Sequence, residues 1–217
     1  MPGSIIEHCI KTKVSGRYLV LRPSSRGPYR LLAGFHGYGE LAEDELDLLK
    51  VIAGGSGWIC CSIEALHPFY TQRGKVGANW MTGRNTGPMI EENVCYADAV
   101  ITEIAGRYPL DGTLVYHGFS RGTAMAACTA LLGSHEAAGV MLLGGNIPPE
   151  HGELGKMKRV HIARGNSDRL YTLKEFERDK ARLEESGVPF VHFGFPGGHE
   201  ATESYLKEAG EFLKQVP

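Results

Sequence analysis

The chain has 217 residues, of which 42% are hydrophobic and 22% charged, with a formal net charge of −2 at pH 7. This length and composition predict a single globular, soluble domain over residues 1–217, with a full hydrophobic core. The small net charge gives no electrostatic reason to expect nucleic acid as a partner. The sequence has no run of about 18 apolar residues, so no membrane span is expected.

The cysteines and the first residues both favour an intracellular protein. Five cysteines form an odd set without metal-ligand spacing, and Cys60 and Cys61 lie in an apolar run that predicts small buried side chains. Residues 1–4 lack the basic region followed by an apolar one that marks a signal peptide. We therefore expect a cytoplasmic protein without disulfides.

Strand-like and helix-like segments alternate along the first half of the chain. Residues 4–14 and 17–22 have the pattern of two short strands joined near Gly16, which predicts an antiparallel hairpin. The following segments are a buried strand at 30–35, a glycine-rich turn at 36–39, a helix at 41–53, a buried strand at 58–63, a loop at 64–90 and a helix at 91–107. The loop is long for a compact domain, and its aromatic residues argue against disorder.

The second half continues the alternation and completes an α/β pattern. Its expected elements are strands ending at residue 119 and spanning 139–143, 159–163 and 189–193, with helices at 121–133, 172–186 and 200–214. This order predicts a three-layer α/β domain with a mostly parallel, eight-stranded sheet and helices on both faces. Residues 144–158 are too few for a large lid.

The stretch from Leu114 to Met125 holds the strongest motif. An apolar strand runs into Gly118-Phe119-Ser120-Arg121-Gly122, and an apolar-periodic helix follows. A G-x-S-x-G sequence between a strand and a helix is typical of a sharp turn that exposes a nucleophilic serine at a helix N-terminus. Ser120 could instead be a simple N-cap, but an N-cap needs no flanking glycines.

Three residues occupy equivalent places in this pattern. Ser120, Asp168 and His199 each follow a predicted parallel strand, where the carboxyl ends of strands bring side chains together. A serine hydroxyl needs a base such as imidazole, and a carboxylate fixes the imidazole tautomer. We therefore predict a Ser120–His199–Asp168 catalytic triad.

Other residues compete for two of these roles. Asp168 could cap the next helix, and Asp98, Asp111 and Asp179 are further carboxylates in less suitable places. His117 and His192 lie within strands, where a core or sheet-face position is the simpler interpretation. His199 lies in a glycine-flanked turn, which favours it as the base.

An acyl-transfer site also needs hydrogen-bond donors for an oxyanion. One is expected from the backbone N–H of Arg121, directly after the serine. The other is expected from Tyr38 in the turn 36–39, with Gly37 or Gly39 as the alternative. An ordinary strand-to-helix turn with a hydrogen-bonded His36 is the competing interpretation.

These motifs together resemble a known family. The segments Phe35–Glu40, Gly118–Gly122, Gly165–Asp168 and Gly197–Glu200, with Asn79-Trp80, are similar to those of α/β-hydrolases of the phospholipase/carboxylesterase family, which includes acyl-protein thioesterases. The resemblance covers about residues 30–214 and implies an α/β-hydrolase fold and esterase chemistry. The chain departs from the family at Glu40, where Asp is usual, at Arg121, where Gln is usual, and after Trp80, where an acidic residue is absent.

The expected substrate is a small or short-chain carboxylic ester or thioester in an open site. Trp80, Phe69 and Tyr70 are candidate substrate-binding residues on the 64–90 loop, although a core role is as compatible with each of them. The Arg121 side chain could face solvent, pair with Glu40 or Glu200, or attract an acidic substrate. We expect a carboxylesterase or thioesterase-type serine hydrolase that needs no cofactor and no metal. A peptidase, an amidase or a C–C hydrolase is the alternative, and a non-catalytic binding protein on the same fold is the least favoured.

Overall fold

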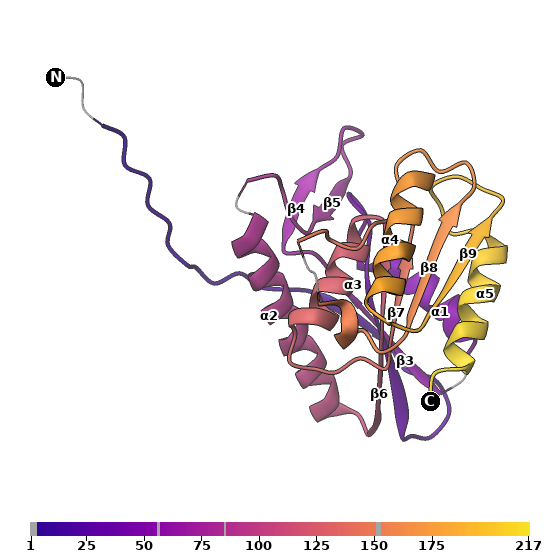
Figure 1. Cartoon of the computed structure of the whole chain (residues 1–217). Helices are drawn as coiled ribbons and strands as arrows, with labels where there is room; N and C mark the ends of the chain where they lie inside the picture. The colour runs from indigo at the N-terminus through magenta and orange to yellow at the C-terminus, as the bar shows by residue number, and fades with distance from the viewer. Residues whose placement is uncertain (1–3, 56, 85, 151–152) are drawn as a thin grey trace.

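The computed structural model describes residues 4–55, 57–84, 86–150 and 153–217. Seven strands form the main sheet in the order β1-β3-β2-β6-β7-β8-β9, in which only β1 is antiparallel to its neighbour (Figure 1). The strands are β1 (Tyr18–Leu21), β2 (Tyr29–Phe35), β3 (Trp58–Ile63), β6 (Leu110–Phe119), β7 (Gly139–Leu143), β8 (Val160–Gly165) and β9 (Phe190–Phe195). A separate pair, β4 (His67–Tyr70) and β5 (Val76–Asn79), forms a small antiparallel hairpin.

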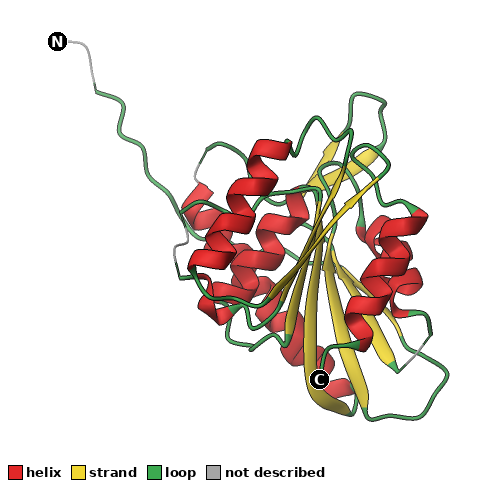
Figure 2. Cartoon of the chain, turned by 45° about the vertical axis from the view of Figure 1, so that its right-hand side comes forward, coloured by secondary structure: helices red, strands yellow, loops and turns green. Residues whose placement is uncertain are grey.

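Helices cover both faces of the sheet, as Figure 2 shows. The helices are α1 (Ala42–Ala53), α2 (Thr86–Arg107), α3 (Arg121–Leu132), α4 (Leu173–Glu185) and α5 (Glu203–Lys214), with a short 3-10 helix at Leu154–Lys156. Buried residues of α2, α3 and α4 form one apolar layer with the sheet, and those of α1 and α5 form a second layer on its other face. The predicted three-layer, mostly parallel α/β architecture is confirmed.

The N-terminal segment departs from its predicted form. The antiparallel pairing is present, but β1 pairs with β3, with Leu21 opposite Cys60, and not with residues 4–14. Those residues form an exposed arm that leads away from the body (Figure 1), so the main sheet has seven strands instead of eight. Ile5 and Ile6 are adjacent, and adjacent strand residues point to opposite faces, so the arm has no single apolar face to bury.

The segment predicted as a loop at 64–90 contains regular structure. It holds the β4–β5 hairpin, and α2 begins at Thr86, five residues before the predicted start of that helix. Cys60 and Cys61 are buried in β3, as the sequence predicts. Within the described ranges, no helix combines the length and the apolar character needed to cross a membrane.

Candidate active site

Ser120 lies at the sharp turn between β6 and α3. Its φ of 53° is the only positive φ of a non-glycine residue in the described parts of the chain. The flanking glycines allow the turn, because an added Cβ at Gly118 would lie 2.3 Å from the Gly122 carbonyl oxygen. An added Cβ at Gly122 would lie 1.8 Å from the Phe35 carbonyl oxygen. The backbone therefore holds the serine in a strained conformation that its surroundings impose.

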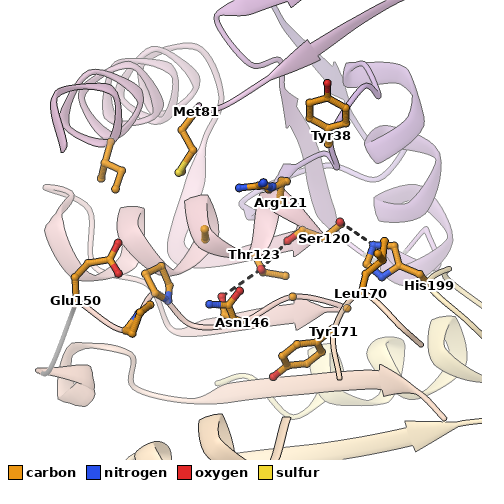
Figure 3. A pocket seen from close by; sticks show the side chains of 16 residues that line it. Tyr38, Met81, Ser120, Arg121, Thr123, Asn146, Glu150, Leu170, Tyr171 and His199 are labelled. Carbon is orange, nitrogen blue, oxygen red and sulfur yellow. Dashed lines mark hydrogen bonds between the residues drawn. The ribbon is translucent and has the colours of Figure 1, made fainter. Parts of the chain in front are cut away.

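The structure brings the three predicted triad residues into one hydrogen-bonded chain. His199 Nε2 lies 2.7 Å from Ser120 Oγ, and His199 Nδ1 lies 2.8 Å from Asp168 Oδ2 (Figure 3 shows the serine–histidine contact). His199 comes from the turn between β9 and α5, and its ring lies 5.1 Å from that of Phe119. Histidine can therefore accept the serine proton on one nitrogen while the carboxylate holds the other.

Asp168 is fixed on its other side by the backbone. Its Oδ1 accepts hydrogen bonds from the amides of Leu170 at 2.8 Å and Tyr171 at 3.0 Å. The Arg164 guanidinium donates to the carbonyl oxygens of Asp168 and Tyr171 and closes the turn after β8. These contacts leave Oδ2 to face His199.

The hydrogen bonds of the turn after β2 distinguish the candidate oxyanion donors. Gly37 N–H donates to Glu40 Oε2 at 2.7 Å, and Gly39 N–H donates to the Ala78 carbonyl at 3.0 Å. Of the three amides of residues 37–39, only that of Tyr38 has no hydrogen-bond partner among the described residues. This pattern favours Tyr38 over Gly37 and Gly39 as an oxyanion donor. The Arg121 amide, at the first position of α3, also has no partner within the helix.

His36 has a structural role in the same turn. It is completely buried, its Nδ1 donates to the Gly37 carbonyl, and its Nε2 accepts from the Ala65 amide. Burial lowers its pKa, which keeps the ring neutral and agrees with this pattern of donors and acceptors.

A hollow of about 650 Å³ opens beside Ser120 and His199 (Figure 3). Its remaining lining residues are Tyr38, Met81, Ile90, Arg121, Thr123, Ala124, Gly144, Gly145, Asn146, Pro148, Pro149, Glu150, Leu170 and Tyr171. Most of the larger side chains on this list are apolar. The hollow can therefore hold a small substrate with an apolar part next to the serine hydroxyl.

The predicted substrate-binding aromatics do not line this hollow. Trp80 is completely buried in the core, where its indole N–H donates to the His36 carbonyl at 2.8 Å. Phe69 and Tyr70, from β4, line a separate hollow of about 790 Å³ that Tyr38 also borders. Trp80 therefore has the core role that the sequence left open beside a substrate-binding role, because its indole has a buried acceptor. Phe69 packs its ring 5.1 Å from that of Tyr38.

Arg121 has an exposed side chain that lines the hollow beside Ser120 (Figure 3). The two carboxylates considered as its partners bind backbone amides instead, Glu40 that of Gly37 and Glu200 that of Gly198. Among the described residues, Arg121 forms no ion pair with either of them. Its positive charge therefore faces the space in which a substrate would lie.

The sequence did not predict four residues that line the hollow. Pro148 and Pro149 follow β7, and Leu170 and Tyr171 follow Asp168. The signal for them was their position, because each pair follows the carboxyl end of a parallel strand, where such sheets build sites.

The sheet order, the serine turn and the Ser–His–Asp geometry together define a class, the α/β-hydrolase fold. Comparison with solved structures shows the same fold. The chain matches no protein-family model, and no curated protein matches it in sequence.

Three of the similar structures are named as carboxylesterases, one of them as a phospholipase/carboxylesterase. A carboxylesterase from Mesorhizobium loti superposes with a TM-score of 0.77 at 18% identity, over 94% of this chain and 97% of its own. A Bacillus cereus carboxylesterase gives 0.74 at 20% identity, over 93% and 95%. A phospholipase/carboxylesterase from Dyadobacter fermentans gives 0.69 at 17% identity, over 94% and 99%.

Proposed function

We propose that this protein is a serine hydrolase of the phospholipase/carboxylesterase type that cleaves small or short-chain carboxylic esters through an acyl-enzyme on Ser120. One observation carries the proposal: the unbroken chain Ser120 Oγ–His199–Asp168, with contacts of 2.7 and 2.8 Å, at a strained serine turn. The resemblance of the motifs and the named esterases of the same fold support the choice of ester chemistry.

Acylation begins when His199 Nε2 takes the proton of Ser120 as Oγ attacks the ester carbonyl carbon. The electron pair of the carbonyl moves onto its oxygen, and the backbone N–H groups of Tyr38 and Arg121 stabilise that oxyanion. Asp168 stabilises the imidazolium. The tetrahedral intermediate then collapses, the bond to the leaving group breaks, and His199 gives its proton to the departing alcohol or thiol.

Deacylation repeats these steps with water as the nucleophile. His199 takes a proton from water, hydroxide adds to the acyl carbon, and the same two amides hold the oxyanion. Collapse releases the carboxylic acid, and the proton on His199 returns to Ser120 Oγ. The net reaction is hydrolysis of one ester or thioester bond.

The hollow favours small substrates. A space of about 650 Å³ with Met81, Ile90 and Leu170 on its walls has room for a short acyl chain and a modest leaving group. The positive charge of Arg121 beside the nucleophile would also suit an acyl or leaving group that carries a carboxylate.

The decisive experiment compares the wild type with Ser120→Ala. We expect the wild type to hydrolyse p-nitrophenyl acetate and butyrate and to be labelled covalently by a fluorophosphonate. Ser120→Ala should lose both activities, with kcat lower by about 10³-fold or more, because the nucleophile is absent. Ser25→Ala, at an exposed loop residue remote from the site, is the matched control.

Full activity in Ser120→Ala would refute the proposal. A panel of ester, thioester and amide substrates with the same acyl group separates the esterase from the amidase or peptidase alternative. A pair of esters that differ by one free carboxylate on the acyl chain measures the contribution of the Arg121 charge.

A further inference from the structure

A second chain of polar side chains is buried beneath the active site, on the face of the sheet that α1 and α5 cover. Glu45 Oε1 lies 2.5 Å from His117 Nδ1, and His117 Nε2 lies 2.8 Å from the Tyr205 hydroxyl. All three side chains are completely inaccessible to solvent. None of them touches the hollow beside Ser120, so the proposed chemistry does not use them directly.

Each of these residues belongs to an element that carries part of the candidate site. Glu45 lies in the first turns of α1, shortly after the turn that presents the Tyr38 amide. His117 lies on β6, three residues before Ser120. Tyr205 lies on α5, six residues after His199. The buried chain therefore connects three parts of the proposed site. They are the turn at residues 36–39, here called the oxyanion turn, the strand β6 before Ser120, and the helix α5 after His199.

Packing alone does not account for this arrangement. Burying a carboxylate and an imidazole removes them from water, and an apolar trio of similar size would fill the same space without that loss. Hydrogen bonds, unlike apolar contacts, fix the direction and distance between the groups that they join. The Cβ that Gly34 lacks would lie 2.3 Å from Glu45 Oε1, so β2 leaves space for the carboxylate.

His161 adds no charge beside this chain, and Tyr205 sets the direction of its hydrogen bonds. His161, from β8, has its ring 6.0 Å from that of Tyr205, and burial lowers its pKa to about 3, so it stays neutral. Burial also raises the pKa of Tyr205, which keeps its hydroxyl protonated and able to donate to His117 Nε2. His117 Nδ1–H then donates to Glu45, and each neighbouring pair has one donor and one acceptor.

We propose that Glu45, His117 and Tyr205 are positioning residues of the hydrolase. From the face of the sheet that α1 and α5 cover, they hold the oxyanion turn, Ser120 and His199 in fixed positions relative to one another. This inference rests on the proposed function, because the three elements need fixed relative positions only if their loops act together in catalysis. Positioning errors of about 1 Å can lower a rate by about 100-fold, so the loss of one link in the chain should affect kcat more than KM.

Tyr205→Phe tests the inference with a minimal change. It removes only the hydroxyl that bonds His117, while the ring still fills its place in the core. Tyr116→Phe is the matched control, since Tyr116 precedes His117 on β6, belongs to the opposite apolar layer and has a buried hydroxyl without a hydrogen-bond partner in the described structure. Phe212→Leu, a buried packing change on α5, controls for loss of stability alone.

We expect Tyr205→Phe to lower kcat on p-nitrophenyl acetate by about tenfold, with KM within about twofold of the wild-type value. The rate of fluorophosphonate labelling should fall in parallel, because it reports attack by Ser120 without ester turnover. Both control variants should keep the wild-type kcat at a temperature at which all the proteins are folded by circular dichroism.

The outcomes separate the two proposals. A wild type that neither hydrolyses esters nor reacts with fluorophosphonate would overturn the proposed function. An active wild type, with Tyr205→Phe and Tyr116→Phe equal to it in kcat and labelling rate, would overturn the positioning role alone. An equal loss of kcat in Tyr205→Phe and Phe212→Leu would also overturn it, since general loosening of α5 would then explain the effect.

Discussion

At the scale of single residues, Glu40 places a titratable carboxyl next to the turn at residues 36–39, which we propose holds the oxyanion. Its carboxylate accepts a hydrogen bond from the Gly37 amide, and the Glu40 amide donates one to the Gly37 carbonyl at 3.3 Å. Two hydrogen bonds between these residues therefore close the turn. Burial raises the pKa of this carboxyl to about 7, although the bond from Gly37 lowers it. The side chain therefore changes charge near neutral pH, next to the amide proposed to hold the oxyanion.

Glu40→Gln should change how stability depends on pH. The wild-type carboxyl has a folded pKa of about 7, above the ordinary value of 4.5. The folded state thus binds more protons than the unfolded state between these values, and wild-type stability should fall as pH rises from 4.5 to 7. The variant should lack this contribution, which we expect to be about 1–2 kcal/mol, and urea unfolding at pH 5 and pH 7.5 measures it. An identical pH dependence in both proteins would contradict the assignment.

At the scale of elements, the β4–β5 hairpin supports the oxyanion turn from outside the main sheet. Ala78 of β5 accepts a hydrogen bond from the Gly39 amide and donates one, at 3.1 Å, to the Glu40 carbonyl. Gly77 allows this approach, because a Cβ there would lie 2.3 Å from the Gly39 carbonyl oxygen. The hairpin therefore helps to set the direction of the Tyr38 amide.

Gly77→Ala should impair catalysis by moving the turn. The added methyl group cannot fit against the Gly39 backbone, so the turn must shift. The Tyr38 N–H then no longer points at the oxyanion. We expect kcat on p-nitrophenyl acetate to fall by about tenfold to 100-fold, a range below the full loss of an oxyanion donor. Gly83→Ala is the control, since a Cβ at Gly83 meets no atom within 4 Å. Equal rates in the two variants would show that the hairpin does not position the Tyr38 amide.

The same elements show what sequence patterns could and could not predict. The buried parallel strands and the helices between them were predictable because long apolar runs and helical stripes are local signals. The β4–β5 hairpin was missed because each strand has only four residues, with Pro68 in one and Gly77 in the other. The pairing partner of β1 was also missed, since alternation predicts an extended strand without indicating which neighbour it joins.

The candidate site could likewise be predicted only in part from the sequence. Ser120, Asp168 and His199 were placed together from their positions at strand ends, and the structure brings them within hydrogen-bond distance. Their catalytic roles stay predictions until the variants are measured. The binding wall was not predictable in the same way, because whether an aromatic such as Trp80 meets substrate or core depends on a partner 44 residues away in the chain.

At the scale of the whole molecule, the sheet separates two apolar layers that share its strands. Leu31 and Leu32 are neighbours on β2, both almost completely buried, yet their side chains belong to opposite layers. Because every central strand contributes to both layers, neither layer can lose its packing without disturbing the other.

Leu31→Ala and Leu32→Ala should therefore lower the midpoint of one common unfolding transition. Each substitution leaves a cavity in a packed layer, and we expect each to reduce the free energy of unfolding by about 2–5 kcal/mol. Urea unfolding followed by both fluorescence and far-ultraviolet circular dichroism should give coincident curves for both variants. Separate transitions in either variant would show that the layers unfold independently.

The backbone of Ser120 has a consequence for how the protein can change over generations. A residue with a side chain is disfavoured at a φ of 53° and ψ of −116°, whereas glycine tolerates such values. Replacement by glycine would relieve about 1–3 kcal/mol of backbone strain and, if the proposed function holds, remove the nucleophile in the same step. Selection for stability alone would then favour glycine at this position and an inert chain, so only selection for turnover would oppose that replacement.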